Sequence, residues 1–244
     1  RSAAAGALGQ LRTRKACKIL LKAATSVKVS KVRSAVVGQL RHCASVKPLL
    51  VLAKRLNEDS SYFVRSAAVR SIAALRHKDS YRHVASALKQ KGYHGTVAST
   101  ALWSLVGFHK KAALPLLKAT IARSSYGRVR RSALMAYASL VQNLDTKKTG
   151  KVRRFLVKYL QGQDTRMQRA AIGALRLLGD ARAVPALRRI ARRAPLRRDR
   201  RRAKRAIRAI YRKQARKDSL GKLRRDVRAL RKEQRKLRKQ LRRL

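Results

Sequence analysis

Acidic residues are scarce in this sequence. Its 244 residues include 10 Asp and Glu against 65 Lys and Arg, which gives a formal net charge of +55. With so few carboxylates, the paired-acid and nucleophile–base–acid arrangements of enzymes have little material to draw on. Mutual repulsion of this size is tolerated mainly where a polyanion or much salt neutralises it. We therefore expect a protein without catalytic residues, whose partner is nucleic acid or another polyanion.

Cysteine and histidine are also few. Cys17 and Cys43 lie 26 positions apart, each among apolar residues in a helix-like stretch, so we expect both to be reduced, buried and structural. That expectation favours a reducing intracellular compartment, such as the cytoplasm, the nucleoid or the nucleus. No two of the five histidines stand three or four residues apart, so neither a metal site nor a cofactor is expected.

Long apolar runs are missing as well. No stretch approaches the roughly 18 apolar residues that a membrane-spanning helix needs, so no membrane span is expected. The chain opens on RSAAAGALGQL, which has neither an initiator Met nor the pattern of a signal peptide, and this suggests a fragment. Even so, 45% of the residues are hydrophobic, which is enough to bury a core and argues against a disordered basic tail.

One short phrase recurs along the chain, with the pattern V-R-x-x-A-hydrophobic-x-x-hydrophobic. Its copies start at positions 32, 64, 97, 129, 167 and 202, a spacing of 32 to 38 residues. Apolar or small residues fall at the first, fifth, sixth and ninth positions, which is a helical stripe. Between copies lies a second apolar run, where Pro115 and Pro185 suit the first turn of a helix. The repeats predict an all-α fold, a right-handed α-solenoid of about seven helix pairs.

The segment DTRMQRAAIGALRLLGDARAVPALRRIA (164–191) resembles a short HEAT repeat of the PBS-lyase-like type over nearly its full length. The order of features from 60–75 through 124–140 to a leucine-rich tail is most similar to the C-terminal HEAT region of bacterial zinc aminopeptidases related to aminopeptidase N. That family carries the zinc motif His-Glu-x-x-His, and no histidine here is followed by Glu. The resemblance therefore implies the scaffold without the peptidase site.

A HEAT-like DNA glycosylase is the less favoured enzyme interpretation. Such enzymes place Trp and Asp around an extruded base, whereas this chain has one tryptophan, Trp103, in a phrase copy that matches the core stripe. We expect Trp103 to pack in the core. The other aromatic residues that the pattern places (Tyr62, Phe63 and Tyr137) also fall on or beside the stripe, so a stacking platform for single strands is not expected.

The arginines of the phrase, Arg33, Arg65 and Arg130, are predicted to form a structural ladder with aspartates of the preceding turns. Asp59, for example, stands six residues before Arg65.

Phosphate contacts are expected from basic residues without a nearby acid. Residues 181–244 hold 29 Lys and Arg against four acids, which is nearly half of the net charge. Contacts of this kind carry no base information, so the predicted ligand is a duplex or structured polyanion bound with little sequence specificity. The predicted phosphate-binding residues are Arg197, Arg198, Arg200, Arg201, Arg202, Lys204, Arg205, Arg208, Arg212 and Lys213.

A second function class stays open, namely a protein-interaction or accessory HEAT domain cut from a larger, aminopeptidase-like enzyme and made cationic by engineering. The surviving aspartates stand chiefly at helix-starting turns, where they cap backbone N–H groups. Both deliberate supercharging and selection for polyanion binding would leave that pattern.

The tail divides the chain into a repeat solenoid over 1–217 and a basic, heptad-patterned helix over 218–244. Heptad positions a and d hold Leu220, Leu223, Val227, Leu230, Gln234, Leu237, Leu241 and Leu244. In a parallel homodimer through 220–244, Asp226 and Glu233 at position g would face Arg231 and Arg238 at position e of the other chain. Alternatively, the leucine stripe folds back and caps the last repeat.

Overall fold

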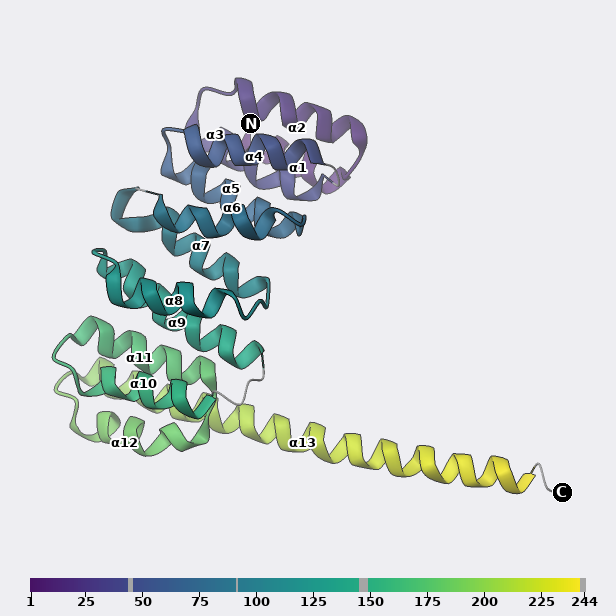
Figure 1. The fold of residues 1–244 in the computed structure, drawn as a ribbon, viewed down its shortest axis with the longest axis vertical. Coiled ribbons are helices and arrows are strands. Elements are labelled where there is room, and N and C mark those ends of the chain that lie inside the picture. Colours follow the sequence, from purple (N-terminus) through teal and green to yellow (C-terminus); the bar gives the residue numbers. More distant parts are fainter. Residues whose placement is uncertain (44–45, 91, 145–148, 242–244) are drawn as a thin grey trace.

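The computed structural model describes residues 1–43, 46–90, 92–144 and 149–241, and within these ranges the regular elements are all helices. Figure 1 shows the helices stacked along one axis, with the last helix leaving the stack at one end. Helices that contain the repeated phrase pack on one another and form an inner layer: α1 (Ser2–Leu11), α3 (Ser30–Gln39), α5 (Tyr62–Leu75), α7 (Thr96–Gly107), α9 (Gly127–Asn143), α11 (Thr165–Leu178) and α13 (Arg197–Leu241).

The helices between the phrase copies form an outer layer, and each packs against neighbouring inner helices: α2 (Arg14–Ser26), α4 (Val46–Glu58), α6 (Ser80–Ser86), α8 (Ala113–Arg123), α10 (Thr149–Gln161) and α12 (Val184–Arg193). Short 3₁₀ turns join some of them: η1 (Leu40–His42), η2 (Ala87–Lys89), η3 (Tyr93–Gly95) and η4 (Ala181–Ala183). The predicted α-solenoid is thus confirmed, although the described residues form six pairs of an inner and an outer helix and a seventh inner helix at the start of α13, where about seven pairs were expected.

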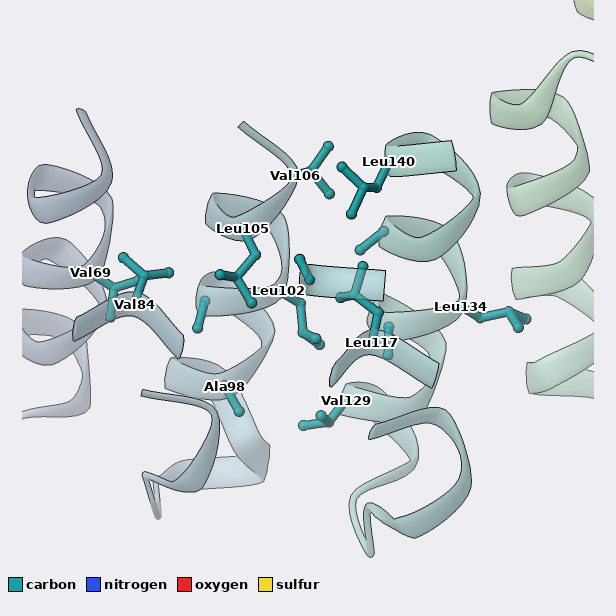
Figure 2. Packing of buried hydrophobic residues seen from close by; sticks show 14 of the residues in the cluster. Val69, Val84, Ala98, Leu102, Leu105, Val106, Leu117, Val129, Leu134 and Leu140 are labelled. Atoms are coloured by element: carbon teal, nitrogen blue, oxygen red, sulfur yellow. The ribbon is translucent and has the colours of Figure 1, made fainter. Parts of the chain in front are cut away.

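The repeated phrase supplies the core. In α5 the predicted stripe of Val64, Ala68, Val69 and Ile72 is fully buried. The corresponding positions of α3, α7, α9 and α11 belong to the same cluster or pack against it, as do Ala206, Ile207 and Ile210 of α13, and the cluster runs from Ala5 to Ile210. Figure 2 shows this packing around α7 and α9, with side chains of neighbouring helices meeting between the ribbons. Each helix therefore buries its stripe against its neighbours, as expected of a stacked repeat.

Turn residues begin and end the helices as the sequence suggests. The Asp164 carboxylate accepts hydrogen bonds from the backbone N–H groups of Arg166 and Met167 at the start of α11. Gly179 ends the same helix in a left-handed conformation with φ of 73°, which glycine adopts without strain. Pro185 lies in the first turn of α12, as predicted.

The expectation of reduced cysteines is wrong. Cys17 of α2 and Cys43, just after η1, form a disulfide, with their Cα atoms 5.8 Å apart. The two cysteines are 26 residues apart in the sequence, but α2 packs against α3 and η1, which brings Cys17 close to Cys43. The reducing compartment predicted from these cysteines therefore has no support from them.

None of the described helices is long and apolar enough to cross a membrane.

The last helix belongs to the solenoid only at its start. Its apolar side chains are buried at Ala203, Ala206 and Ile210, and α13 then continues as one helix to Leu241. The predicted boundary between 217 and 218 falls inside this helix. Figure 1 shows α13 running straight out of the stack, so the alternative in which the tail folds back as a cap is wrong for the described residues.

The disulfide leads to a stability prediction. It closes a loop of 26 residues, and by the chain-entropy relation a link of that length stabilises the folded state by about 3.5 kcal/mol. We expect a reductant to lower the melting temperature of the protein and to leave the Cys17→Ser/Cys43→Ser double variant unchanged. Thermal melts by circular dichroism with and without reductant measure both. Two free thiols in the unreduced, denatured protein would contradict the link itself.

Candidate functional site

An open groove of about 730 Å³ lies across the inner helices α9, α11 and α13. Seven arginines line it, and we call the set the arginine groove: Arg128, Arg131, Arg166, Arg169, Arg176, Arg202 and Arg205. The other lining residues are Ser132, Met135, Ala170, Ile172, Gly173 and Ala206. No Asp or Glu is among the lining residues, so the groove is a strongly cationic hollow.

The repeat places these arginines. Arg128 and Arg166 stand one residue before the first position of the phrase, and Arg131 and Arg169 stand two residues after it. Successive positions three residues apart share one face of a helix. In α9 and α11 these arginines line the groove, whereas the third position of the phrase holds buried serines in α5 and α7, namely Ser66 and Ser99.

Small residues keep the groove hollow. Ala170 and Gly173 of α11 lie on its floor beside Met135 of α9. A Cβ atom added at Gly173 would lie 3.4 to 4.0 Å from the Met135 side chain, which is ordinary van der Waals contact. The small residues at 170 and 173 thus leave space in the groove next to α11.

One arginine of the groove is held in place by an acid. Arg169 donates from Nε to Oδ1 of Asp199 at 2.7 Å and from Nη2 to Oδ2 at 3.0 Å. Asp199 lies in the first turn of α13 and is 3% exposed. The hydrogen bonds from Arg169 lower the pKa of Asp199 despite its burial, and the charges of neighbouring arginines add to that effect. The pair joins α11 to α13 and fixes one wall of the groove.

The remaining six arginines of the groove have no carboxylate within 4.0 Å among the residues that the structure describes. Their charges are thus not neutralised by the protein. Guanidinium groups offer paired N–H donors that match the geometry of phosphate and carboxylate oxygens. The arrangement suits an anionic ligand with several such oxygens in a row.

The predicted ladder of phrase arginines with aspartates is confirmed for Arg33 and is wrong for Arg65 and Arg130. Arg33 donates from Nε to Oδ2 of Asp59 at 2.7 Å and from Nη2 to Oδ1 of Asp59 at 2.9 Å. The aspartate therefore lies in the turn after α4, one repeat further along the chain than predicted. Arg65, which was expected to bind Asp59, instead donates to Oε1 of Gln90 at 3.2 Å, and Arg130 donates to the backbone oxygen of Ile121 at 3.0 Å.

Two of the ten predicted phosphate-binding residues lie in the groove, namely Arg202 and Arg205. Two others bind backbone oxygens of the protein: Arg200 donates to Ala194 at 2.8 Å, and Lys213 donates to Leu177 at 3.0 Å. Burial lowers the pKa of Lys213, and the charge of Lys217 adds to that effect. The other six are exposed on α13: Arg197, Arg198, Arg201, Lys204, Arg208 and Arg212.

Sequence reasoning missed the groove arginines of α9 and α11. It searched for dense runs of charge, whereas these side chains are spread over two repeats and gather only when the helices stack. The available signal was their position in the phrase, because Arg128 and Arg166 are equivalent, as are Arg131 and Arg169.

The expectation that Trp103 packs in the core is wrong. Its side chain is 41% exposed on α7. Trp103 occupies the seventh position of its phrase copy, outside the stripe of Val97, Ala101, Leu102 and Leu105. Met135 and Gly173, which line the groove, hold the same position in α9 and α11. Two further aromatic side chains expected to follow the stripe are partly open: Phe63 is exposed and Tyr62 is half-buried.

Comparison with known families accounts for the repeats. Residues 49–138 match the family of HEAT repeats, and residues 167–192 match the PBS lyase HEAT-like repeat. Over these two segments the sequence is similar to HEAT repeats. The first matched segment contains α5, α7 and most of α9, and the second contains most of α11 and of α12. A comparison with curated proteins finds no significant match.

Several solved structures are similar to this chain at low sequence identity. The complex of CpcE and CpcF of phycocyanin lyase from Nostoc sp. PCC7120 is 20% identical, with a TM-score of 0.44 over 86% of this chain and 87% of that chain. Two engineered proteins of the Northeast Structural Genomics Consortium are each 18% identical. The first has a TM-score of 0.47, and the match covers 80% of this chain and 96% of that protein's chain. The second has a TM-score of 0.48, and the match covers 86% of this chain and 64% of that protein's chain.

The buried aspartates lead to a prediction about acid. Burial alone would raise the pKa of Asp59, but hydrogen bonds from Arg33 and Ser61 and the charges of Arg33 and Arg55 outweigh it, so the pKa is lowered. The pKa of Asp199 is lowered too. Because both folded pKa values lie below the unfolded value of about 3.9, their stabilisation is complete above about pH 5. It is lost as the pH falls below about 4.

We therefore expect melting temperatures that stay level from pH 8 to about 5 and fall below about 4. Asp59→Asn should destabilise the protein by roughly 3 kcal/mol at pH 7, because it leaves a buried arginine without its charge partner. The matched control is Asp218→Asn, since Asp218 is exposed and accepts a hydrogen bond from Gln214 only. Equal stability of the two variants across this pH range would contradict the assignment.

Proposed function

We propose that this protein is a non-catalytic HEAT scaffold that binds the phosphate backbone of duplex nucleic acid in the arginine groove. The observation that carries the proposal is the groove itself, in which seven arginines from three helices converge without a lining carboxylate. Phosphate oxygens supply the acceptors that such guanidinium groups match. The net charge of +55 supports the same ligand class, because a polyanion relieves the repulsion of the free protein.

The dimensions of the groove suit a duplex. Adjacent packed helices lie about 8 to 10 Å apart, so three inner helices span roughly 20 Å. Each strand of a duplex presents about six phosphates over that length, at one per 3.4 Å of helix axis. The exposed basic side chains of α13 extend the cationic surface beyond the groove, and they include Arg197, Arg198, Arg201, Lys204, Arg208 and Arg212.

Binding of this kind gains affinity from the release of counterions and is nearly independent of base sequence. Arginine side chains in a shallow groove reach phosphates and not the edges of the bases. The proposal therefore includes a strong dependence on salt and little preference among sequences.

A second candidate is a protein-interaction scaffold, which includes an accessory domain of a larger enzyme whose surface has been made basic. The match to HEAT repeats over residues 49–138 supports the protein-interaction scaffold at least as directly as it supports nucleic-acid binding, because stacked repeats offer extended surfaces for protein partners. The N-terminal half also exposes large apolar side chains, among them Phe63, Tyr93 and Trp103. Side chains of this kind are enriched at the centres of protein interfaces.

The first candidate is tested by removing one groove arginine from each of three helices. We expect Arg131→Ala/Arg176→Ala/Arg205→Ala to weaken binding of a 20-base-pair duplex. The slope of log K against log salt should become shallower by about 2 to 3, at roughly 0.9 per lost phosphate contact. Fluorescence anisotropy at several salt concentrations measures both quantities.

The matched control removes three exposed basic residues of the outer helices α8, α10 and α12, namely Lys118, Arg154 and Arg192. It changes the net charge by the same amount and leaves the groove intact. Equal loss in the two triple variants would show that overall charge, and not the groove, binds the duplex. Tighter binding of poly-L-glutamate than of the duplex by the groove would favour an acidic protein partner and the second candidate.

A further inference from the structure

The projecting part of α13 carries an apolar stripe that the solenoid leaves uncovered. Leu220, Leu223 and Leu230 are 55%, 58% and 65% exposed, and Val227 is 40% exposed. Figure 1 shows this part of the helix standing clear of the stack. The solenoid therefore cannot cover the stripe, and a helix with so much exposed leucine needs another partner in water.

The stripe begins where the contacts with the solenoid end. Ile210 is the last fully buried residue of α13, and Lys213 still donates a hydrogen bond to Leu177 of α11. In the heptad register with Leu220 at position a, the preceding a and d positions hold Lys213 and Arg216. These charged residues end the apolar stripe on the side nearest the solenoid. The apolar stripe, which is the seam of the proposed coiled coil, therefore covers the same residues as the part of α13 that does not contact the solenoid.

The spacing along the seam is that of a two-stranded coiled coil. Apolar residues alternate at intervals of three and four from Leu220 through Leu230, and Leu237 and Leu241 continue the pattern in the sequence. Every d position from 223 to 237 holds Leu, which favours two strands, and Gln234 at position a favours one register. Leu244, the last expected d residue, lies outside the described residues.

We propose that α13 pairs with α13 of a second copy of this chain as a parallel coiled coil over residues 220–241. In a parallel pair, position g faces position e of the next heptad on the other chain. Asp226 then meets Arg231 of the partner subunit, and Glu233 meets Arg238 of the partner subunit. Two of the three acids in residues 218–244 therefore stand where a parallel pair needs them.

The antiparallel alternative has less favourable electrostatics. In an antiparallel pair, position e faces position e of the other chain, which would bring Arg224, Arg231 and Arg238 against arginines of the second copy. Like charges at such positions destabilise the pair. The distribution of charge thus favours the parallel orientation.

Repulsion limits the strength of this pairing. Residues 218–244 hold 12 Lys and Arg against three acids, so two tails at close range repel each other at low ionic strength. At about 1 M salt the screening length falls to about 3 Å, which removes most of this repulsion between exposed charges. Dimerisation should therefore strengthen as neutral salt rises, which is opposite to the behaviour expected of phosphate binding. The proposal does not rest on the function of the arginine groove.

Sedimentation velocity of the full chain at about 50 μM tests the pairing, in about 0.1 M and 1 M sodium chloride. We expect a mass of two chains in high salt and more monomer in low salt. The variant Leu223→Gln/Leu230→Gln should be monomeric at both concentrations. Ala229→Gln, at heptad position c and exposed, is the control that keeps the seam and should dimerise like the unchanged protein.

Monomer in 1 M salt, or a dimer that survives Leu223→Gln/Leu230→Gln, would overturn the proposal. The orientation is tested with a spin label on Ser219→Cys, which is unique because Cys17 and Cys43 are joined in a disulfide. A parallel pair places the two labels within about 20 Å of each other. An antiparallel pair over 220–241 would separate the label positions by roughly 35 Å along the axis, at 1.5 Å per residue, and would refute the parallel arrangement.

Discussion

The stacking of apolar stripes between consecutive inner helices is the interaction on which the rest of the structure depends. One helix of this chain buries too little surface to be stable alone, and its stripe is covered only when the neighbouring repeats are in place. The cluster that results runs from Ala5 to Ile210. Some positions of the inner helices are not needed for this core, and in α9 and α11 they include those of Arg128, Arg131 and Arg166. That freedom allows arginines to gather in a groove without disturbing the fold.

Four of the few acidic residues stabilise the same stack of helices. Asp59 and Asp199 are buried and hold arginines of neighbouring repeats, while Asp164 and Asp180 accept hydrogen bonds from backbone N–H groups at the starts of α11 and η4. At each of these places the carboxylate satisfies groups that would otherwise be left without a partner. These four of the ten acids therefore stabilise the fold directly, whereas Glu58, Asp218 and Asp226 are exposed. The exposed faces, where a carboxylate would stabilise little, are almost entirely basic.

The solenoid could be predicted from the sequence because its cause is local. A stripe such as Val64, Ala68, Val69 and Ile72 shows in the spacing of one segment, and the period of the phrase shows how often it recurs. The disulfide between Cys17 and Cys43 and the pairing of Arg33 with Asp59 depend on which turns of successive repeats meet in space. No local pattern contains that information. The prediction for Trp103 was wrong for a related reason. Tryptophan is apolar and was therefore assigned to the core, although position 103 lies outside the stripe.

The proposed binding of phosphate in the groove and the proposed pairing of the tail would depend on ionic strength in opposite ways. Phosphate binding by arginines weakens as salt rises, because the gain from counterion release falls. Pairing of the basic tails strengthens as salt rises, because their repulsion is screened. A bound polyanion would reduce this conflict at low ionic strength, where it binds best and where the repulsion between the tails is strongest. A ligand long enough to reach both grooves of a parallel dimer would then raise the local concentration of each site for the other. Binding and pairing would support each other through the ligand's charge, although neither requires the other to occur.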